Sequence, residues 1–194
     1  MESKSDGSRF YLDGAVLYTH VDSEGRNRLD YVAAMERALV GARSVLILGT
    51  AGGALASQLC RRGIEVTTVD NVAASFDLAR RWFGMPADVQ CVHADALAFL
   101  DETVDRWDAV AIDVFKGAEI PWVMFGPAVG GLLVKSLRPG GRIVWNVADD
   151  TRSLTAFRVE KILRAAGLAA RRVAVLDETA GNTLVIATPQ DTRD

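Results

Sequence analysis

The sequence is poor in the features that mark secreted, membrane-embedded and nucleic-acid-binding proteins. It contains only two cysteines, Cys60 and Cys91, whose spacing is not that of a metal site, so we predict a reducing, cytoplasmic location and no bound metal. No apolar run reaches the ~18 residues that a membrane-spanning helix needs, and we expect the polar first residues not to be a signal peptide. A net charge of −3 gives no basic footprint for nucleic acid or for an anionic membrane.

One stretch, residues 43–70, has the pattern of a nucleoside-binding site. The apolar run Val45–Leu48 ends abruptly in Gly49-Thr-Ala-Gly-Gly53, and a helix is predicted directly after this turn. Small residues allow backbone to lie against a ligand, and the N-terminal amides of the helix face the same place. The next β-rich run ends at Asp70, which follows Gly49 at about the 20-residue spacing at which an acid meets ribose hydroxyls.

Strand-like and helix-like patterns alternate along the chain, which predicts a parallel sheet with helices on both faces. Further β-rich runs occur at residues 89–92, 107–112 and 142–147. Two last runs, Arg171–Leu176 and Thr183–Thr188, are joined by a short polar turn and predict an antiparallel hairpin. The predicted fold class is therefore α/β: a doubly wound, Rossmann-like sheet of seven strands, mostly parallel, with a C-terminal antiparallel hairpin strand.

We divide the chain into two parts that together form one globular unit. Residues 1–40 are predicted to form an N-terminal hairpin, with its turn at Leu12-Asp13-Gly14, followed by a lid helix. Apolar residues recur at helical spacing from Leu29 to Leu39, and Gly41 ends the helix. Residues 41–194 are predicted to form the Rossmann-like, ligand-binding domain.

Three acids stand at the carboxyl ends of predicted parallel strands: Asp70, Asp95 and Asp113. Ligands of open α/β sheets bind at these ends, near the point where the strand order reverses. The alternative for each residue is structural, because aspartate also begins turns and caps helices. Three such acids at one edge favour a binding site.

Several segments resemble a known family when they are taken in order. They are Gly49-Thr-Ala-Gly-Gly-Ala-Leu55, Thr68-Val-Asp70, Ala94-Asp-Ala-Leu-Ala-Phe-Leu100, Trp107-Asp-Ala-Val-Ala-Ile-Asp113 and Leu137-Arg-Pro-Gly-Gly141. Together they resemble the class I S-adenosylmethionine-dependent methyltransferases, and in particular their spermidine-synthase-like branch. Leu12-Asp13-Gly14, Tyr31 and Asp113-Val-Phe-Lys-Gly117 also fit that branch. The resemblance implies that residues 41–194 bind S-adenosyl-L-methionine.

The resemblance also implies roles for the residues of the first two strand ends. Gly49, Ala51 and Gly53 are expected to face the methionine part of the cofactor. The spacing Gly49-x-Ala51-x-Gly53 departs from the G-x-G-x-x-G of a pyrophosphate turn and fits a methionine tail and ribose better. Asp70 is expected to hold the ribose hydroxyls, with Asn71 beside the adenine.

The remaining candidates lie at the adenine and at the reactive end. Asp95 is expected to accept from the adenine amino group, and Ala96 to offer its backbone amide. Asp113 is the predicted catalytic carboxylate, beside the sulfonium, with a role in capping the next loop as the alternative. Tyr31 matches a substrate-pocket tyrosine of the family, or else lies at a helix interface. His20 is a candidate general base, or else a solvated loop histidine.

Departures from the family decide between its reactions. Aminopropyltransferases carry Asp in the glycine turn where this chain has Ala51, and Lys116 replaces a second loop acid. The chain is therefore predicted to be an enzyme that transfers an alkyl group, most simply methyl, to a small molecule. The alternatives are intramolecular cyclisation or lysis of the cofactor with release of methylthioadenosine (for example, formation of 1-aminocyclopropane-1-carboxylate), aminopropyl transfer, and a non-catalytic nucleoside-binding module. No nucleic-acid or membrane partner is predicted, and a homodimer is kept as an alternative assembly.

Overall fold

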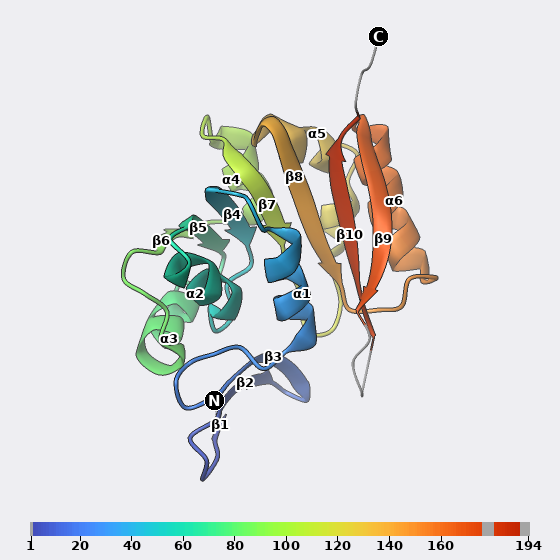
Figure 1. Ribbon diagram of the computed structural model, residues 1–194. Helices are drawn as coiled ribbons and strands as arrows, with labels where there is room; N and C mark the ends of the chain where they lie inside the picture. Colours follow the sequence, from blue (N-terminus) through green and yellow to red (C-terminus); the bar gives the residue numbers. More distant parts are fainter. Residues whose placement is uncertain (1, 176–180, 191–194) are drawn as a thin grey trace.

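The computed structural model describes residues 2–175 and 181–190, and its centre is a seven-stranded sheet (Figure 1). The strand order is β6-β5-β4-β7-β8-β10-β9, and all neighbours are parallel except the two pairs that β10 forms. The strands are β4 (Ser44–Leu48), β5 (Glu65–Asp70), β6 (Gln90–His93), β7 (Trp107–Ile112), β8 (Leu137–Val147), β9 (Leu168–Val175) and β10 (Asn182–Pro189). This topology confirms the predicted fold class, although Leu176 of the predicted hairpin lies outside the described residues.

Helices cover both faces of the sheet. One face carries α1 (Asp30–Ala38), α2 (Ala54–Arg61) and α3 (Ala74–Phe83), and the other carries α4 (Ala96–Glu102), α5 (Val129–Lys135) and α6 (Leu154–Ala165) (Figure 1). A 3₁₀ turn, η1 (Trp122–Phe125), precedes α5. Within the described residues, no helix is both long enough and apolar enough to cross a lipid bilayer.

The unbroken apolar runs of the central strands arise because both sheet faces are covered. In β4, Leu46 and Leu48 pack with the cluster under α4, α5 and α6, whereas Val45 and Ile47 pack with the cluster under α1, α2 and α3. All four side chains are buried. The strand therefore has no polar face, and it stands at the centre of the sheet between β5 and β7.

The first part of the chain forms a small antiparallel sheet of its own. It consists of β1 (Glu2–Ser3), β2 (Arg9–Asp13) and β3 (Val16–Val21), and Figure 1 shows it below the carboxyl ends of the parallel strands. The predicted hairpin turn is confirmed, and Gly14 adopts the left-handed conformation there, with φ +58°. The lid helix is α1, which packs against α2 and the main sheet. The division of the chain at residue 40 stays a prediction.

Two elements differ from the sequence-based expectation. Helix α4 was not predicted, because Asp95 was assigned as a strand-end acid and it also caps this short helix. Strand β8 begins at Leu137 rather than at residue 142, so the segment Arg138–Gly141 belongs to the strand. Its pairing with β7 is irregular between Trp107 and Ala109, and the extra residues of β8 are accommodated there.

Candidate active site

A cleft of about 530 Å³ lies at the carboxyl ends of the central strands, between them and the N-terminal hairpin. This volume falls within the range of about 300–1,000 Å³ that is typical of small-molecule sites. Seven of the predicted site residues line it: Gly49, Ala51, Asp70, Asn71, Asp95, Ala96 and Asp113. The structure thus brings together residues from the ends of four strands, β4, β5, β6 and β7, as the strand-end rule predicts.

The turn after β4 is shaped by close contacts rather than by glycine content alone. Gly49 has φ +92°, and a Cβ atom there would lie 2.2 Å from the backbone oxygen of Asp113. Ala51 is also left-handed, with φ +46°, which is uncommon for a residue with a side chain. Gly53 begins α2, and a Cβ there would meet the Sδ of Met85 at 2.7 Å. Gly53 is therefore required for packing on Met85, and it does not line the cleft.

Asp70 is oriented by the backbone around it. Its Oδ2 accepts from the N–H of Thr50 at 2.8 Å, and its Oδ1 accepts from the N–H of Val72 at 2.8 Å. These bonds fix the carboxylate at the end of β5 while each oxygen keeps a second lone pair. The neighbouring Asn71 is exposed, and its backbone oxygen bonds the Nε2 of His93 at 3.2 Å.

Asp95 has the structural role that sequence analysis left open. It is the N-cap of α4, and its Oδ1 accepts from the N–H groups of Leu97 at 2.9 Å and Ala98 at 3.1 Å. Both bonds use one oxygen, so Oδ2 can still accept from a ligand. The helix begins at Ala96, which also lines the cleft.

Asp113 lies at the floor of the cleft, directly after β7, and is half-buried. Its Oδ1 accepts from the Nδ2 of Asn146 at 2.8 Å, and its Oδ2 accepts from the hydroxyl of Tyr31 at 3.3 Å. Burial raises the pKa of this carboxyl, and the two donors oppose that rise. The pKa of Tyr31 is also raised, first by burial and then by the charge of Asp113. In the described residues, no hydrogen bond from the Asp113 side chain caps the following loop.

Asn146 is the site residue that sequence reasoning missed. It lies within the apolar run of β8 and is only 2% exposed. The one signal in the sequence is a carboxamide inside an otherwise apolar strand, since a buried amide needs hydrogen-bond partners. Tyr31 does not itself line the main cleft, but it lines a small cavity together with Gly49 and Asp113.

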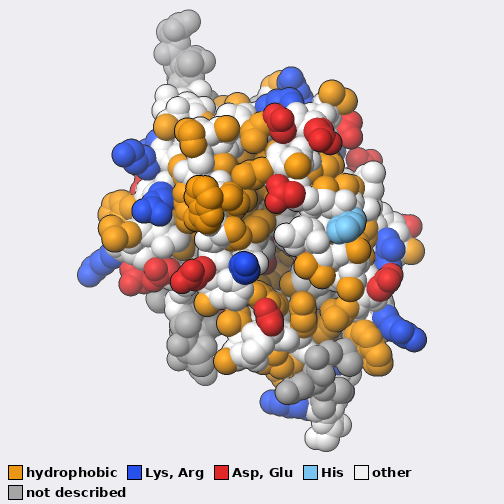
Figure 2. Space-filling view, turned by 180° about the vertical axis from the view of Figure 1, so that it is seen from behind, with side chains coloured by type: hydrophobic (Ala, Val, Ile, Leu, Met, Phe, Trp, Pro, Cys, Tyr) orange, Lys and Arg blue, Asp and Glu red, His pale blue; other side chains and the backbone are white. Residues whose placement is uncertain are grey.

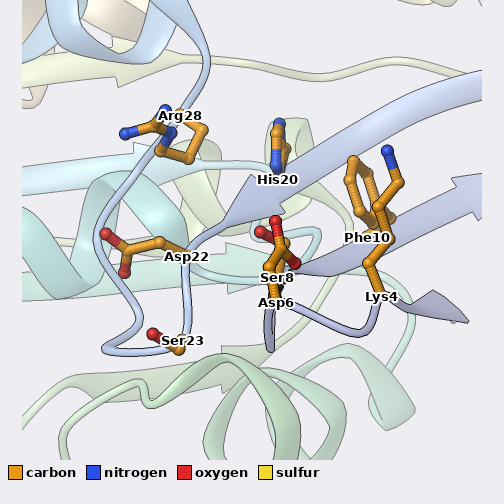
Figure 3. Close-up of a pocket in the computed structure, with 8 residues that line it drawn as sticks. All are labelled: Lys4, Asp6, Ser8, Phe10, His20, Asp22, Ser23 and Arg28. Atoms are coloured by element: carbon orange, nitrogen blue, oxygen red, sulfur yellow. Dashed lines mark hydrogen bonds between the residues drawn. The ribbon is translucent and has the colours of Figure 1, made fainter.

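His20 lies apart from these residues. It lines a separate cavity of about 280 Å³ on the N-terminal sheet, where its ring stacks on Phe10 with the centroids 4.1 Å apart (Figure 3). Its pKa is lowered, first by burial and then by the positive charges of Arg28 and Lys4. His20 follows Tyr18 by two residues on β3, and a rise of about 3.4 Å per residue carries it past the cleft. We therefore remove His20 from the catalytic candidates.

The mouth of the cleft combines an apolar wall with one lysine. Pro121, Val123 and Met124 form the wall, and the exposed Lys116 lies on the same loop. The hydroxyl of Tyr18 on β3 donates to the backbone oxygen of Gly117 at 2.9 Å, which ties the hairpin to this loop. Figure 2 shows one face of the molecule, with hydrophobic side chains gathered in clusters and Lys and Arg side chains scattered among acids.

Comparisons with known proteins agree with this fold. No family model matches the chain. It is 32% identical, over 108 residues (55% of the chain, 24% of the relative), to a probable polyamine aminopropyl transferase of Bifidobacterium longum. Methyltransferases occur among the other curated relatives. The chain therefore spans 24% of the length of this aminopropyl transferase, and 21% and 34% of the length of two other curated relatives.

Two solved structures carry the comparison further. A probable spermidine synthase of Corynebacterium glutamicum has a TM-score of 0.79 at 19% identity, covering 96% of this chain and 75% of the other. The N-methyltransferase NodS of Bradyrhizobium japonicum, in complex with S-adenosylhomocysteine, has a TM-score of 0.64 at 21% identity, covering 83% and 85% of the two chains. The resemblance predicted from the motifs is thus confirmed at the level of the fold.

Proposed function

We propose that this chain, with the Rossmann-like fold shared by class I S-adenosylmethionine-dependent methyltransferases and spermidine synthases, is an S-adenosylmethionine-dependent alkyltransferase. Its simplest reaction is methyl transfer to a small molecule, and the two unmodified cysteines are compatible with a cytoplasmic enzyme. The observation that carries the proposal is the single cleft onto which Gly49, Asp70, Asp95 and Asp113 converge. Neighbours of this fold that hold S-adenosylhomocysteine support it.

The donor and acceptor chemistry of the cleft fits this cofactor. Asp70 offers acceptor oxygens for ribose hydroxyls, and the exposed Asn71 lies beside it for the adenine. Asp95 offers Oδ2 to an amino group, and Ala96 lies next to it. Gly49 lets the ends of β4 and β7 approach closely, since a Cβ there would lie 2.2 Å from the backbone oxygen of Asp113, and this places Asp113 beside the glycine turn, where the methionine part would lie.

The chemistry that S-adenosylmethionine supplies when bound is an electrophilic carbon attached to a sulfonium. The chain's own contribution is the carboxylate of Asp113, which lies on the floor of the same cleft. A carboxylate there attracts a positive centre, because an opposite charge in a partly buried site is screened less than in water. It can also orient an acceptor N–H or O–H and take its proton. Tyr31 and Asn146 hold its two oxygens, so positioning requires no rearrangement of the carboxylate.

Aminopropyl transfer is the second candidate, because curated relatives bear that name. A diamine substrate needs negative partners at both ends, and two positions argue against it. Ala51 replaces the acid that the resemblance places in the glycine turn, and the cation at Lys116 would repel a polyamine at the mouth of the cleft. Intramolecular release of methylthioadenosine remains the third reaction to test.

One set of incubations separates these reactions. Purified protein is incubated with S-adenosylmethionine alone, with S-adenosylmethionine and a panel of amine and hydroxyl acceptors, and with the decarboxylated cofactor and putrescine. We expect S-adenosylhomocysteine to form only when an acceptor is present. Formation of methylthioadenosine in the first mixture would show the intramolecular reaction. Its formation in the third mixture alone would show aminopropyl transfer. Failure of S-adenosylhomocysteine to bind in calorimetry would overturn the proposal altogether.

A further inference from the structure

A chain of side-chain hydrogen bonds leads away from Asp113 through the sheet. Asn146 on β8 donates from Nδ2 to Asp113 Oδ1 at 2.8 Å, and its Oδ1 accepts from the Nδ2 of Asn182 at 3.0 Å. Asn182 is the first residue of β10, which pairs antiparallel with β8. Asn182 does not line the cleft, and among the described residues its side chain is linked to Asp113 through Asn146.

The direction of each bond in this chain is fixed by chemistry. An ionised carboxylate can only accept, so the NH₂ group of Asn146 must face Asp113. The carbonyl oxygen of Asn146 must then face Asn182, whose NH₂ group satisfies it. Because Asn146 is 2% exposed, water offers little replacement for either partner. Without Asn182, the amide of Asn146 loses the partner that keeps its oxygen turned away from the carboxylate.

We propose that Asn182 is a positioning residue: it fixes the amide of Asn146 so that Asn146 holds the carboxylate of Asp113 ionised and aimed into the cleft. This inference rests on the proposed function, since it assigns Asn182 to the same reaction centre. The donor chain reaches Asp113 from β8, and Tyr31 reaches it from α1. The carboxylate is thus held between two donors from two different elements.

Other charged and titratable groups face this carboxylate from the elements around it. Tyr31 of α1 and Tyr18 of β3 share its small cavity, Asp70 of β5 lies in the same cleft, and Lys116 lies three residues further along its own loop. None of these four groups changes when Asn182 is replaced. A change in the protonation of Asp113 in Asn182→Ala, which adds no charge, therefore reports on the Asn146 donor.

The test measures the protonation of Asp113 directly and needs no acceptor substrate. Protein labelled with ¹³C at the aspartate carboxyl carbons is titrated by NMR, and the Asp113 signal is assigned with Asp113→Asn. We expect Asn182→Ala to increase the proton affinity of Asp113 roughly tenfold, which corresponds to about one pH unit. Asn182→Asp keeps the shape but replaces the donor with an acceptor, and we expect at least as large an increase.

A matched control separates positioning from general loosening of the hairpin. The buried Thr183 on β10 donates from Oγ1 to the backbone oxygen of Asp149 at 2.7 Å, away from Asp113. Thr183→Val is expected to lower Tm while leaving the titration of Asp113 unchanged. An unchanged Asp113 titration in both folded Asn182 variants would overturn the inference. The affinity for S-adenosylhomocysteine is measured in parallel at pH 8, and we expect Asn182→Ala to bind it as tightly as wild type. If wild-type protein does not bind S-adenosylhomocysteine, the proposed function is refuted, whereas the titration of Asp113 still tests the role of Asn182.

Discussion

Gly49→Ala tests whether the contact between two strand ends builds the candidate site. The added Cβ would lie 2.2 Å from the backbone oxygen of Asp113, whereas ordinary contacts begin near 3.4 Å, so the ends of β4 and β7 must separate by about 1.2 Å. Left-handed backbone costs an L-residue about 1–2 kcal/mol, and overpacking typically adds about 1–3 kcal/mol. We therefore expect a loss of about 2–5 kcal/mol in the free energy of unfolding.

Gly63→Ala provides the control, because Gly63 has a similar φ of +77° but nothing within 4 Å of an added Cβ. Gly63→Ala should lower the free energy of unfolding only by the cost of a left-handed backbone, about 1–2 kcal/mol. Urea denaturation measures both variants, and calorimetry measures their affinity for S-adenosylhomocysteine. We expect the affinity to fall at least tenfold in Gly49→Ala and to stay at the wild-type value in Gly63→Ala. Equal losses of stability, with equal affinities, would refute the steric argument.

Three further predictions concern carboxylates. Asp70→Asn replaces one oxygen that accepts a backbone N–H with a donor, so we expect at least about tenfold weaker binding of S-adenosylhomocysteine in calorimetry; an unchanged Kd would remove Asp70 from the ribose contact. Burial raises the pKa of Asp113 in the folded state. The ionised carboxylate therefore lowers the free energy of unfolding once the pH rises above 3.8, the ordinary pKa of an aspartate side chain. Asp113→Asn should therefore be more stable than wild type at pH 7 but not at pH 3, and it should bind S-adenosylhomocysteine yet lose turnover; full activity would contradict its catalytic role. The pKa of Asp108 is lowered, chiefly by the backbone N–H of Arg43, so its stabilisation is present at neutral pH and is lost as the pH falls through the lowered pKa. Asp108→Asn should thus destabilise the protein in urea at pH 7 and much less at pH 3, and a constant deficit would show that charge is not the cause.

The strand ends that sequence analysis predicted correctly depend on local patterns. The apolar run before Gly49 and the β-rich run before Asp70 each report a strand end, and parallel strands bring such ends to one edge. Helix α4 was hidden because Asp95 serves both as a strand-end acid and as an N-cap, and only the second role announces a helix.

The parts that were missed depend on distant pairings. The contact of Asn146 with Asp113 spans 33 residues, and that of Asn182 with Asn146 spans 36 residues. The first follows from the register of β8 on β7, which pairs Ile112 with Trp145, and the second from the register of β10 on β8, which pairs Leu184 with Asn146. A shift of one residue in this register would turn the Asn182 side chain to the other face of the sheet. The register of short apolar strands cannot be predicted from the sequence alone.

The late position of Asn182 along the chain has a consequence for synthesis. Nascent domains begin to fold as they leave the ribosome, with N-terminal segments first. The glycine turn and the carboxylates of β5 and β7 can meet once about 120 residues have emerged. Asn182, which donates to the amide of Asn146, arrives only with β10, the last of the seven strands of the sheet in chain order. Nascent chains stalled before β10 should therefore bring Gly49 and Asp70 together while the hydrogen-bond chain to Asp113 is still incomplete.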